Sequence, residues 1–145
     1  MRRLQSRIDK TSDNYQTYRA HNLDLLAELK RKSEAARHDR PARDLARLEK
    51  QNKMRVHERI AHLLDPGTPF LEFSTLAGNM AYDGEAPQAS IVTGLGMVSG
   101  REVVIHADDS SVKGGAWYPL SVKKINFSDV FELLVEILIQ YFVSL

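Results

Sequence analysis

The chain contains no cysteine among its 145 residues. A disulfide framework, a thiol nucleophile and a thiolate-bound metal are therefore excluded, and the absence fits a reducing compartment. No apolar run follows the first two arginines, so the start is not expected to be a secretory signal. The apolar run within residues 126–145 carries Glu132 and Glu136 and is shorter than the ~20 residues of a membrane span, so no membrane role is expected.

The net charge is only +1, but the charges are unevenly placed. Residues 1–63 carry 16 Lys/Arg against 9 Asp/Glu, whereas residues 64–145 carry 4 against 10. A basic segment can bind nucleic acid or the phosphates of a cofactor, or it can be the solvated face of helices. Because the segment has no aromatic residues beyond Tyr15 and Tyr18 for base stacking, we expect no nucleic-acid partner.

Hydrophobic spacing predicts helices in the first part of the chain. Residues 4–34 are expected to form one helix, because leucines recur every three residues with charges between them. The buried stripe of this helix would consist of Leu23, Leu26 and Leu29. Pro41 disfavours helix at the preceding residue, so a second helix is expected from residue 42 to residue 64.

The hydrophobic period changes to two in the second part of the chain, which is typical of strands. The predicted elements are a short strand over 70–76, a polar loop over 79–88 and a hairpin of strands over 90–98 and 101–107. The apolar, β-branched composition of the hairpin predicts that both of its faces are covered. The glycines of "GLGMVSG" lie inside this hairpin, which favours close backbone approach or a bulge over a dinucleotide fingerprint.

Side chains with catalytic or metal-binding chemistry are sparse. His106, Asp108 and Asp109 lack a second ligand cluster, so polar residues at a strand end are favoured over a metal site. Ser110 and Ser111 have no identifiable base beside them, which argues against a nucleophilic triad. We therefore expect no catalytic side chain and no metal ligand.

The segment "VKGGAWYP" is the strongest candidate for ligand contact. Gly114 and Gly115 leave backbone N–H groups unobstructed, and Lys113 adds positive charge. Trp117 and Tyr118 offer flat apolar surface beside them. The spacing is not that of the phosphate loop of nucleotide hydrolases. From these residues alone, a ligand-contacting turn and a plain tight turn both remain open.

Several motifs follow one another in a characteristic order: "VHERIAHLLDPGTPFLEFS", "YDGEAP" and "VTGLGMVSGREVVIHADDSSVKGGAWYPLSVKKI". Together they closely resemble the start of the carboxyltransferase β subunit of biotin-dependent acyl-CoA carboxylases, and "KGGAWYP" is most similar to the methylcrotonyl-CoA and geranyl-CoA branch. The resemblance covers residues 55–125. It implies an α/β chain with a helical arm (1–64), the start of a crotonase-like domain (65–125) and a tail outside the family pattern (126–145).

The resemblance also implies a function. Family members transfer a carboxyl group from carboxybiotin to an acyl-CoA such as 3-methylcrotonyl-CoA, with the biotin attached to a partner subunit. The implied partners are the acyl-CoA, a biotin carboxylase/biotin carrier α subunit and further copies of the β chain. The implied location is the bacterial cytoplasm, or the mitochondrial matrix in a eukaryote. The residues placed at the acyl-CoA cleft are Lys113, Gly114, Gly115 and Tyr118.

Family chemistry relies on backbone donors, since two converging N–H groups stabilise a thioester oxyanion by ~3–4 kcal/mol each. By the same resemblance, Arg55 and Arg59 are expected to be structural or peripheral to the ligand. The family's second glycine pair and its biotin-receiving half do not follow here, so we expect a truncated and inactive product. The alternative is a non-catalytic CoA-binding or subunit-interaction module. Residues 126–145 could form a helix with Ser128 as its N-cap.

Overall fold

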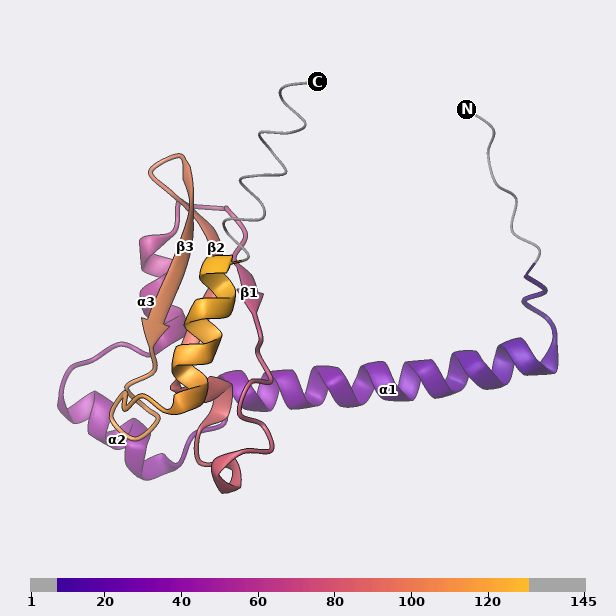
Figure 1. Cartoon of the computed structure of the whole chain (residues 1–145), viewed down its shortest axis with the longest axis horizontal. Helices are drawn as coiled ribbons and strands as arrows, with labels where there is room; N and C mark the ends of the chain where they lie inside the picture. The colour runs from indigo at the N-terminus through magenta and orange to yellow at the C-terminus, as the bar shows by residue number, and fades with distance from the viewer. Residues whose placement is uncertain (1–7, 131–145) are drawn as a thin grey trace.

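A three-stranded antiparallel sheet lies in the body of the computed structural model, from which α1 (Asp13–His38) projects to one side; the structure describes residues 8–130 (Figure 1). The strands lie in the order β1 (Leu71–Phe73), β2 (Ile91–Val98) and β3 (Arg101–Asp108). The helices are α1 (Asp13–His38), α2 (Ala42–Lys50), α3 (Val56–Leu63) and an unlabelled helix that includes residues 119–130. Two 3₁₀ turns, η1 (Tyr82–Gly84) and η2 (Pro87–Ser90), precede β2. The protein is therefore a mixed α/β chain.

The β2–β3 hairpin confirms the predicted strand pair. Its register places Val98 opposite Arg101, so the connection is a two-residue turn. Ser99 and Gly100 both have positive φ, 53° and 73°, as the hairpin turn that matches strand twist requires. The carboxylate of Asp65 accepts hydrogen bonds from both of their N–H groups, each at 2.7 Å. The turn is thereby fixed to the end of the helical part of the chain.

The glycines inside the hairpin allow the close backbone approach that the sequence predicts. A Cβ added at Gly94 would lie 2.5 Å from the carbonyl oxygen of Leu71 and from the ring of Phe70. A Cβ added at Gly96 would overlap the side chain of Leu64. Neither position has room for a larger residue without displacement of its neighbours.

The apolar core lies between α3 and the hairpin. Its buried members are Val56, Ile60, Val92, Ile105 and Ala107. Strand β2 is largely buried along its length, as expected for a central strand. The expectation that both hairpin strands are covered is wrong for β3, because β3 is an edge strand and its Arg101, Glu102 and His106 are exposed.

Helix α1 differs at both ends from the predicted range of 4–34. It begins at Asp13 because Ser12 is its N-cap, with the Ser12 hydroxyl accepting a hydrogen bond from the N–H of Tyr15 at 3.3 Å. It continues to His38, and the chain then breaks before Pro41 as predicted.

The helix predicted over 42–64 is two helices, α2 and α3. Asn52 has a φ of 50°, and its N–H bonds to the carbonyl of Glu49 at 2.9 Å. The N–H of Lys53 bonds to the carbonyl of Leu48 at 3.0 Å. These two bonds form a Schellman motif with asparagine in the left-handed position, which ends α2. The hydrophobic period continued across the break and concealed it.

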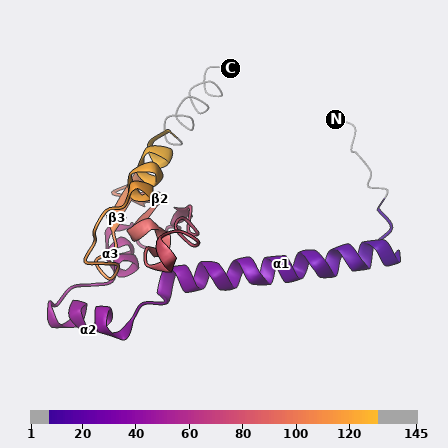
Figure 2. The same cartoon turned by 60° about the horizontal axis from the view of Figure 1, so that its bottom comes forward.

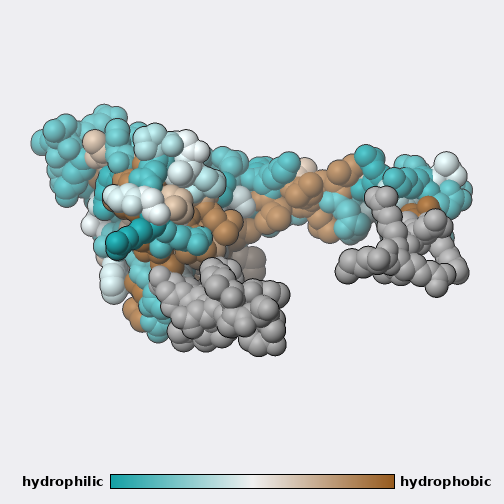
Figure 3. Space-filling view, turned by 90° about the horizontal axis from the view of Figure 1, so that it is seen from above, coloured by the Kyte–Doolittle hydropathy of each residue, from teal (hydrophilic) through white to brown (hydrophobic). Residues whose placement is uncertain are grey.

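The leucines of α1 do not form a buried stripe, contrary to the prediction. Leu23, Leu26 and Leu29 are 44–50% exposed. Figures 1 and 2 show the reason: only the C-terminal end of α1 meets the body, and the rest of the helix projects away from it. In the view of Figure 3, hydrophobic residues are visible along the projecting part of α1. The helix therefore presents apolar side chains to its surroundings.

The helix after the glycine pair begins at Pro119, earlier than the predicted tail helix. Ser128 is not its N-cap but lies inside the helix, where its hydroxyl donates a hydrogen bond to the carbonyl of Lys124 at 2.9 Å. Tyr118 precedes the helix, and its N–H donates to the hydroxyl of Ser121 at 2.9 Å. Residues 131–145 lie outside the described part of the chain.

Candidate functional site

The segment that the sequence singled out forms an exposed turn after β3. Lys113, Gly114 and Gly115 have φ values of 47°, 77° and 87°, so three left-handed residues follow one another. The N–H of Gly115 donates to the carbonyl of Val112 at 2.8 Å. A Cβ added at Gly114 would meet no atom within 4 Å, so this backbone faces open space. Lys113, Gly114 and Gly115 thus form one exposed turn, but the N–H of Gly115 is already bonded to Val112, so the prediction of unobstructed N–H groups at both glycines is wrong for Gly115.

Lys113 is held at this turn by an exposed ion pair. Its Nζ lies 2.9 Å from Oε2 of Glu85, and the two side chains are 45% and 60% exposed. The hydrogen bond from Lys113 to Glu85 raises the pKa of the lysine, so the ammonium is charged at neutral pH. Exposed ion pairs contribute little to stability. Glu85 can therefore be displaced by another anion at little cost to the fold.

Two aromatic residues flank the turn on its C-terminal side. The ring of Tyr118 lies against that of Tyr82, with centroids 4.6 Å apart and the planes tilted by 40°. Trp117 is exposed, and its Nε1 donates to Oδ1 of Asp108 at 2.7 Å. Tyr118 therefore packs against Tyr82 beside the turn. Tyr82 and Glu85 were not predicted as site residues, although both belong to the quoted motif "YDGEAP".

A cavity of about 180 Å³ lies beside the turn, at the junction of α1 and α2. Its basic lining residues are Arg40, Arg43 and Lys113, and its acidic ones are Asp39, Asp44 and Glu85. Sites for drug-sized ligands occupy roughly 300–1,000 Å³, so this cavity could hold only part of a larger molecule. The acidic and basic lining residues of the cavity are equal in number, so Lys113 at the turn is the group that offers a positive charge to a ligand on the surface.

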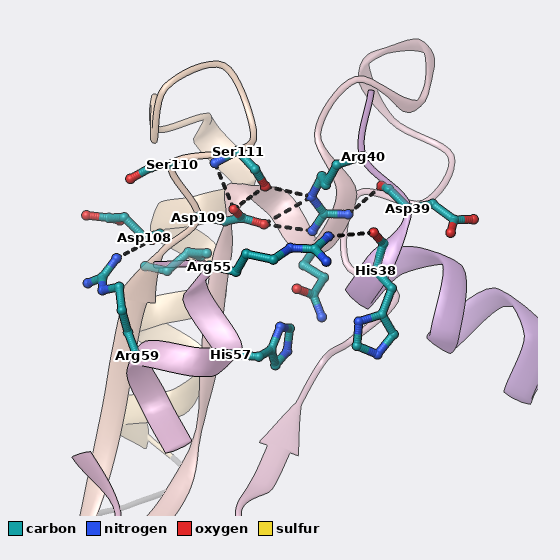
Figure 4. A network of polar contacts seen from close by, with 12 residues as sticks. His38, Asp39, Arg40, Arg55, His57, Arg59, Asp108, Asp109, Ser110 and Ser111 are labelled. Atoms are coloured by element: carbon teal, nitrogen blue, oxygen red, sulfur yellow. Dashed lines mark hydrogen bonds and ion pairs between the residues drawn. The ribbon is translucent and has the colours of Figure 1, made fainter. Parts of the chain in front are cut away.

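A buried ion pair fixes the chain immediately before the turn (Figure 4). Arg40 contacts Oδ2 of Asp109 through Nη2 at 2.7 Å and Nε at 3.1 Å, and both side chains are almost fully buried. The N–H and the hydroxyl of Ser111 donate to Oδ1 of the same carboxylate. Burial raises the pKa of Asp109, but the Ser111 hydrogen bonds and the Arg40 charge outweigh it and hold the pKa below its usual value.

The two arginines of the α3 region bind backbone carbonyls. Arg55 donates from Nη2 to the carbonyl of His38 at 2.8 Å, and Arg59 donates from Nη1 to that of Asp108 at 3.1 Å (Figure 4). These contacts tie α3 to the end of α1 and to the end of β3. They support the structural role expected for Arg55 and Arg59.

A second polar cluster surrounds Glu72 on β1. Nε of Arg37 lies 2.8 Å from Oε2 of Glu72, and Nε2 of His57 lies 3.5 Å from the same oxygen. Burial raises the pKa of Glu72, but His57 and Arg37 together lower it below its ordinary value. The Nε2 amide of Gln88 donates to Oε1. This cluster links α1, α3 and η2 to the sheet, and no sequence motif indicated it.

Three buried residues before β2 have left-handed backbone. Gln88, Ala89 and Ser90 have φ values of 55°, 55° and 58°, and none of them is glycine. Such a conformation costs roughly 1–2 kcal/mol per residue, so the surrounding structure must hold it in place. Local strain of this kind is concentrated near functional sites in proteins.

No helix within residues 8–130 is long and apolar enough to cross a membrane.

Comparison with known families places residues 47–135 in the carboxyl transferase domain family. The match extends ten residues into the segment 126–145. A Mycobacterium tuberculosis protein, the biotin-dependent 3-methylcrotonyl-coenzyme A carboxylase beta1 subunit, is 48% identical over 100 residues, which are 69% of this chain and 19% of that protein. The probable mitochondrial methylcrotonoyl-CoA carboxylase beta chain of Drosophila melanogaster is 38% identical over 122 residues, 83% of this chain and 21% of that protein.

Solved structures give the same relationship. The beta subunit of geranyl-CoA carboxylase from P. aeruginosa matches with a TM-score of 0.56 and 30% identity, over 83% of this chain and 22% of that one. Transcarboxylase 12S, described as a hexamer assembly, matches with a TM-score of 0.57 and 28% identity. The match covers 78% of this chain and 22% of the transcarboxylase chain. The chain therefore spans about one fifth of the length of these relatives.

Proposed function

This chain belongs to the carboxyl transferase domain family, and from that membership we propose that it is the acyl-CoA-binding start of a carboxyltransferase β subunit. The acyl-CoA is proposed to be 3-methylcrotonyl-CoA. In this proposal, residues 1–64 are a helical arm and residues 65–125 begin a crotonase-like domain. The observation that carries it is the open Lys113–Gly115 turn, in a chain that is 48% identical over 100 residues to a 3-methylcrotonyl-coenzyme A carboxylase subunit.

The chemistry of the turn supports binding rather than proton transfer. Lys113 offers a charged ammonium to a phosphate or carboxylate, and Gly114 leaves the backbone accessible to a ligand that lies flat on it. Tyr82 and Tyr118 offer an aromatic surface beside these groups. We assign Lys113, Gly114, Gly115 and Tyr118 to substrate contact and assign no residue to catalysis.

Biotin on a partner subunit would supply the carboxyl group in this family's reaction. The cavity beside the turn does not fit biotin, because its volume is only about 180 Å³ and six of its eleven lining residues are charged. No step is therefore assigned to contact between biotin and the described residues. The partners we propose are the acyl-CoA, a biotin-carrying α subunit and further copies of the chain, in the cytoplasm or the mitochondrial matrix.

Isothermal titration calorimetry of the full chain with 3-methylcrotonyl-CoA tests the proposal. We expect saturable binding that weakens as ionic strength rises, because a charged group of the ligand meets Lys113. Lys113→Met should weaken binding, whereas Lys123→Met, which removes an exposed lysine elsewhere, should not. Absence of binding by the wild-type chain, or equal binding by both variants, would contradict the proposal.

A carboxylation assay tests the second part of the proposal. We expect no turnover of 3-methylcrotonyl-CoA, geranyl-CoA or propionyl-CoA above background, even with a family biotin-carrying subunit supplied. The chain spans about one fifth of its relatives, and its candidate site contains binding groups only. Clear turnover of any of the three would show that the chain carries a complete active site.

Helix α1 supports a second candidate function, subunit interaction. Tyr18, Leu25, Leu26 and Leu29 share one side of the helix and are exposed, which is typical of a protein–protein contact. We propose a second copy of the chain as the partner of this surface. Sedimentation of the wild type should show self-association that Leu25→Asp abolishes. A monomeric wild type would contradict this candidate.

A further inference from the structure

The helix that contains residues 119–130 buries polar side chains, although some of its apolar side chains are exposed. Ser121, Lys124 and Ser128 recur at helical spacing and are buried, with residue exposures of 0%, 4% and 0%. Val122 and Phe127 lie on the other side and are about half exposed. A helix that buries polar groups must satisfy them with hydrogen bonds, since an unpaired buried donor is costly. The partners of these groups therefore indicate what the helix does.

Ser121 and Lys124 both donate to main-chain carbonyls around the left-handed residues before β2. Nζ of Lys124 lies 2.7 Å from the carbonyl oxygen of Ile91 and 3.1 Å from that of Gln88. The hydroxyl of Ser121 donates to the carbonyl of Ala89 at 2.6 Å. A charged donor makes stronger hydrogen bonds than a neutral one. These three hydrogen bonds therefore attach the strained, left-handed segment 88–90 to the helix that begins at residue 119.

The strained segment in turn holds both ends of the loop that carries the glycine pair. The carbonyl of Ser90 accepts the N–H of Asp109 at 2.9 Å, at the start of the loop. The hydroxyl of Ser90 donates to the carbonyl of Ala116 at 2.6 Å, just after Gly115. Ser121 also accepts the N–H of Tyr118 at 2.9 Å. One buried residue, Ser90, thus joins the two ends of the exposed turn.

We propose that Ser121 and Lys124 are positioning residues, which fix the left-handed segment Gln88–Ser90 and through it the conformation of the Lys113–Gly115 turn. This inference rests on the proposed function only for the identity of the ligand, since the hydrogen bonds form without a bound ligand. Burial lowers the pKa of Lys124 to about 8, so the amine is mainly charged at neutral pH and can form its bonds to both carbonyls.

Hydrogen exchange of the full chain without ligand tests the positioning directly. We expect the amides of Asp109 and Gly115 to exchange about tenfold faster or more in Lys124→Met than in the wild type, because local opening of the loop becomes easier. The amides of the β2–β3 ladder should change far less. Lys123→Met is the matched control, since it removes the neighbouring exposed lysine, and it should leave both sets unchanged.

A second set of variants separates positioning from loss of the fold. Ser121→Ala removes the bonds to Ala89 and Tyr118 and should accelerate exchange in the loop, whereas Ser121→Thr keeps a hydroxyl and should restore part of the protection. Ser90→Ala removes the bond to Ala116 and should free the C-terminal end of the loop. These variants keep the inference testable if Lys124→Met does not fold.

The outcomes distinguish this inference from the proposed function. Unchanged loop protection in folded Lys124→Met or Ser121→Ala would overturn the positioning role. Equal acceleration across the hairpin and the loop would also overturn it, because the residues would then serve the fold in general. Titration with 3-methylcrotonyl-CoA measures ligand binding independently of hydrogen exchange. Weaker binding by Lys124→Met supports the inference, whereas a wild type that does not bind refutes the proposed function and leaves the exchange result decisive for positioning.

Discussion

Two ion pairs with similar distances hold the chain at the candidate site, one through Asp109 and the other through Lys113, four residues later. Arg40 and Asp109 are joined at 2.7 Å with side chains 2% and 3% exposed, whereas Lys113 and Glu85 are joined at 2.9 Å with side chains 45% and 60% exposed. The first pair is shielded from water and cannot exchange its partner without loss of structure. The second pair is solvated and exchangeable. The buried Arg40–Asp109 pair therefore fixes the scaffold, whereas the exposed Lys113–Glu85 pair leaves the lysine accessible to a ligand.

The largest expected effect comes from breaking the buried pair. Arg40→Met should lower the free energy of unfolding by about 3–5 kcal/mol, because the carboxylate of Asp109 would remain buried without its cation. Urea denaturation measures the loss. Arg43→Met is the control, since that side chain is 86% exposed, and it should have little effect. If Arg40→Met lowers the free energy of unfolding by less than about 1 kcal/mol, the buried pair stabilises the fold no more than an exposed pair does.

Lys124 is a buried cation that has no carboxylate of residues 8–130 in hydrogen-bond contact. Burial lowers its pKa to about 8, although the charge of Glu72 opposes the shift, while an unfolded lysine titrates near ~10.4. Between these pH values the unfolded chain binds more protons than the folded chain, so stability rises with pH. The rise should be about 3 kcal/mol between pH 8 and pH 10.5.

Urea denaturation at a series of pH values checks this expectation for Lys124. The wild type should gain stability above pH 8 relative to Lys124→Met, whose side chain does not titrate. Parallel curves for the two proteins over this range would contradict the burial of a titrating amine at this position.

A smaller effect is expected at the exposed turn itself. Gly114→Ala should cost about 1–2 kcal/mol, because the φ of 77° is unfavourable for an L-residue although a Cβ would have open space. Thermal unfolding measures the change. Gly96→Ala provides the contrast, since its Cβ would overlap Leu64, and its larger loss would come from displaced neighbours. A loss at Gly114 as large as at Gly96 would show that the turn is not open.

The smallest expected effect concerns the exposed pair. Glu85→Gln should leave the unfolding temperature unchanged and should tighten binding of 3-methylcrotonyl-CoA by up to about fivefold, since the Glu85 carboxylate no longer competes with the ligand for the Lys113 ammonium. Calorimetric titration of the two proteins at one ionic strength measures the ratio. Weaker binding by the variant would show that Glu85 itself supports the ligand.

The sequence predicted those parts of the structure that depend on local interactions. The hairpin followed from period-two hydrophobicity and the Ser99-Gly100 turn, and the open turn followed from adjacent glycines. The break at Asn52 was missed because asparagine replaces the usual glycine in the left-handed position. The buried pair was missed because Arg40 and Asp109 are 69 residues apart, and no local pattern reports such a contact.

The exposure of the α1 leucines shows a different limit of the sequence. Their spacing predicts an apolar face, but it does not say whether that face is covered by the same chain. The helix that begins at Pro119 shows the same limit in the opposite sense, because its buried residues up to residue 130 are two serines and a lysine. In both helices the tertiary arrangement, rather than the hydrophobic pattern, decides which side faces the body.

We propose that a fixed scaffold presents an open, charged turn to a CoA thioester. Trp117 is the single tryptophan of the chain and lies two residues after Gly115, so its fluorescence reports on this turn directly. Titration with 3-methylcrotonyl-CoA should produce a saturable change in Trp117 emission that Lys113→Met weakens and Lys123→Met leaves intact. A Trp117 signal that does not change with the CoA thioester, or that changes equally in both variants, would contradict the account.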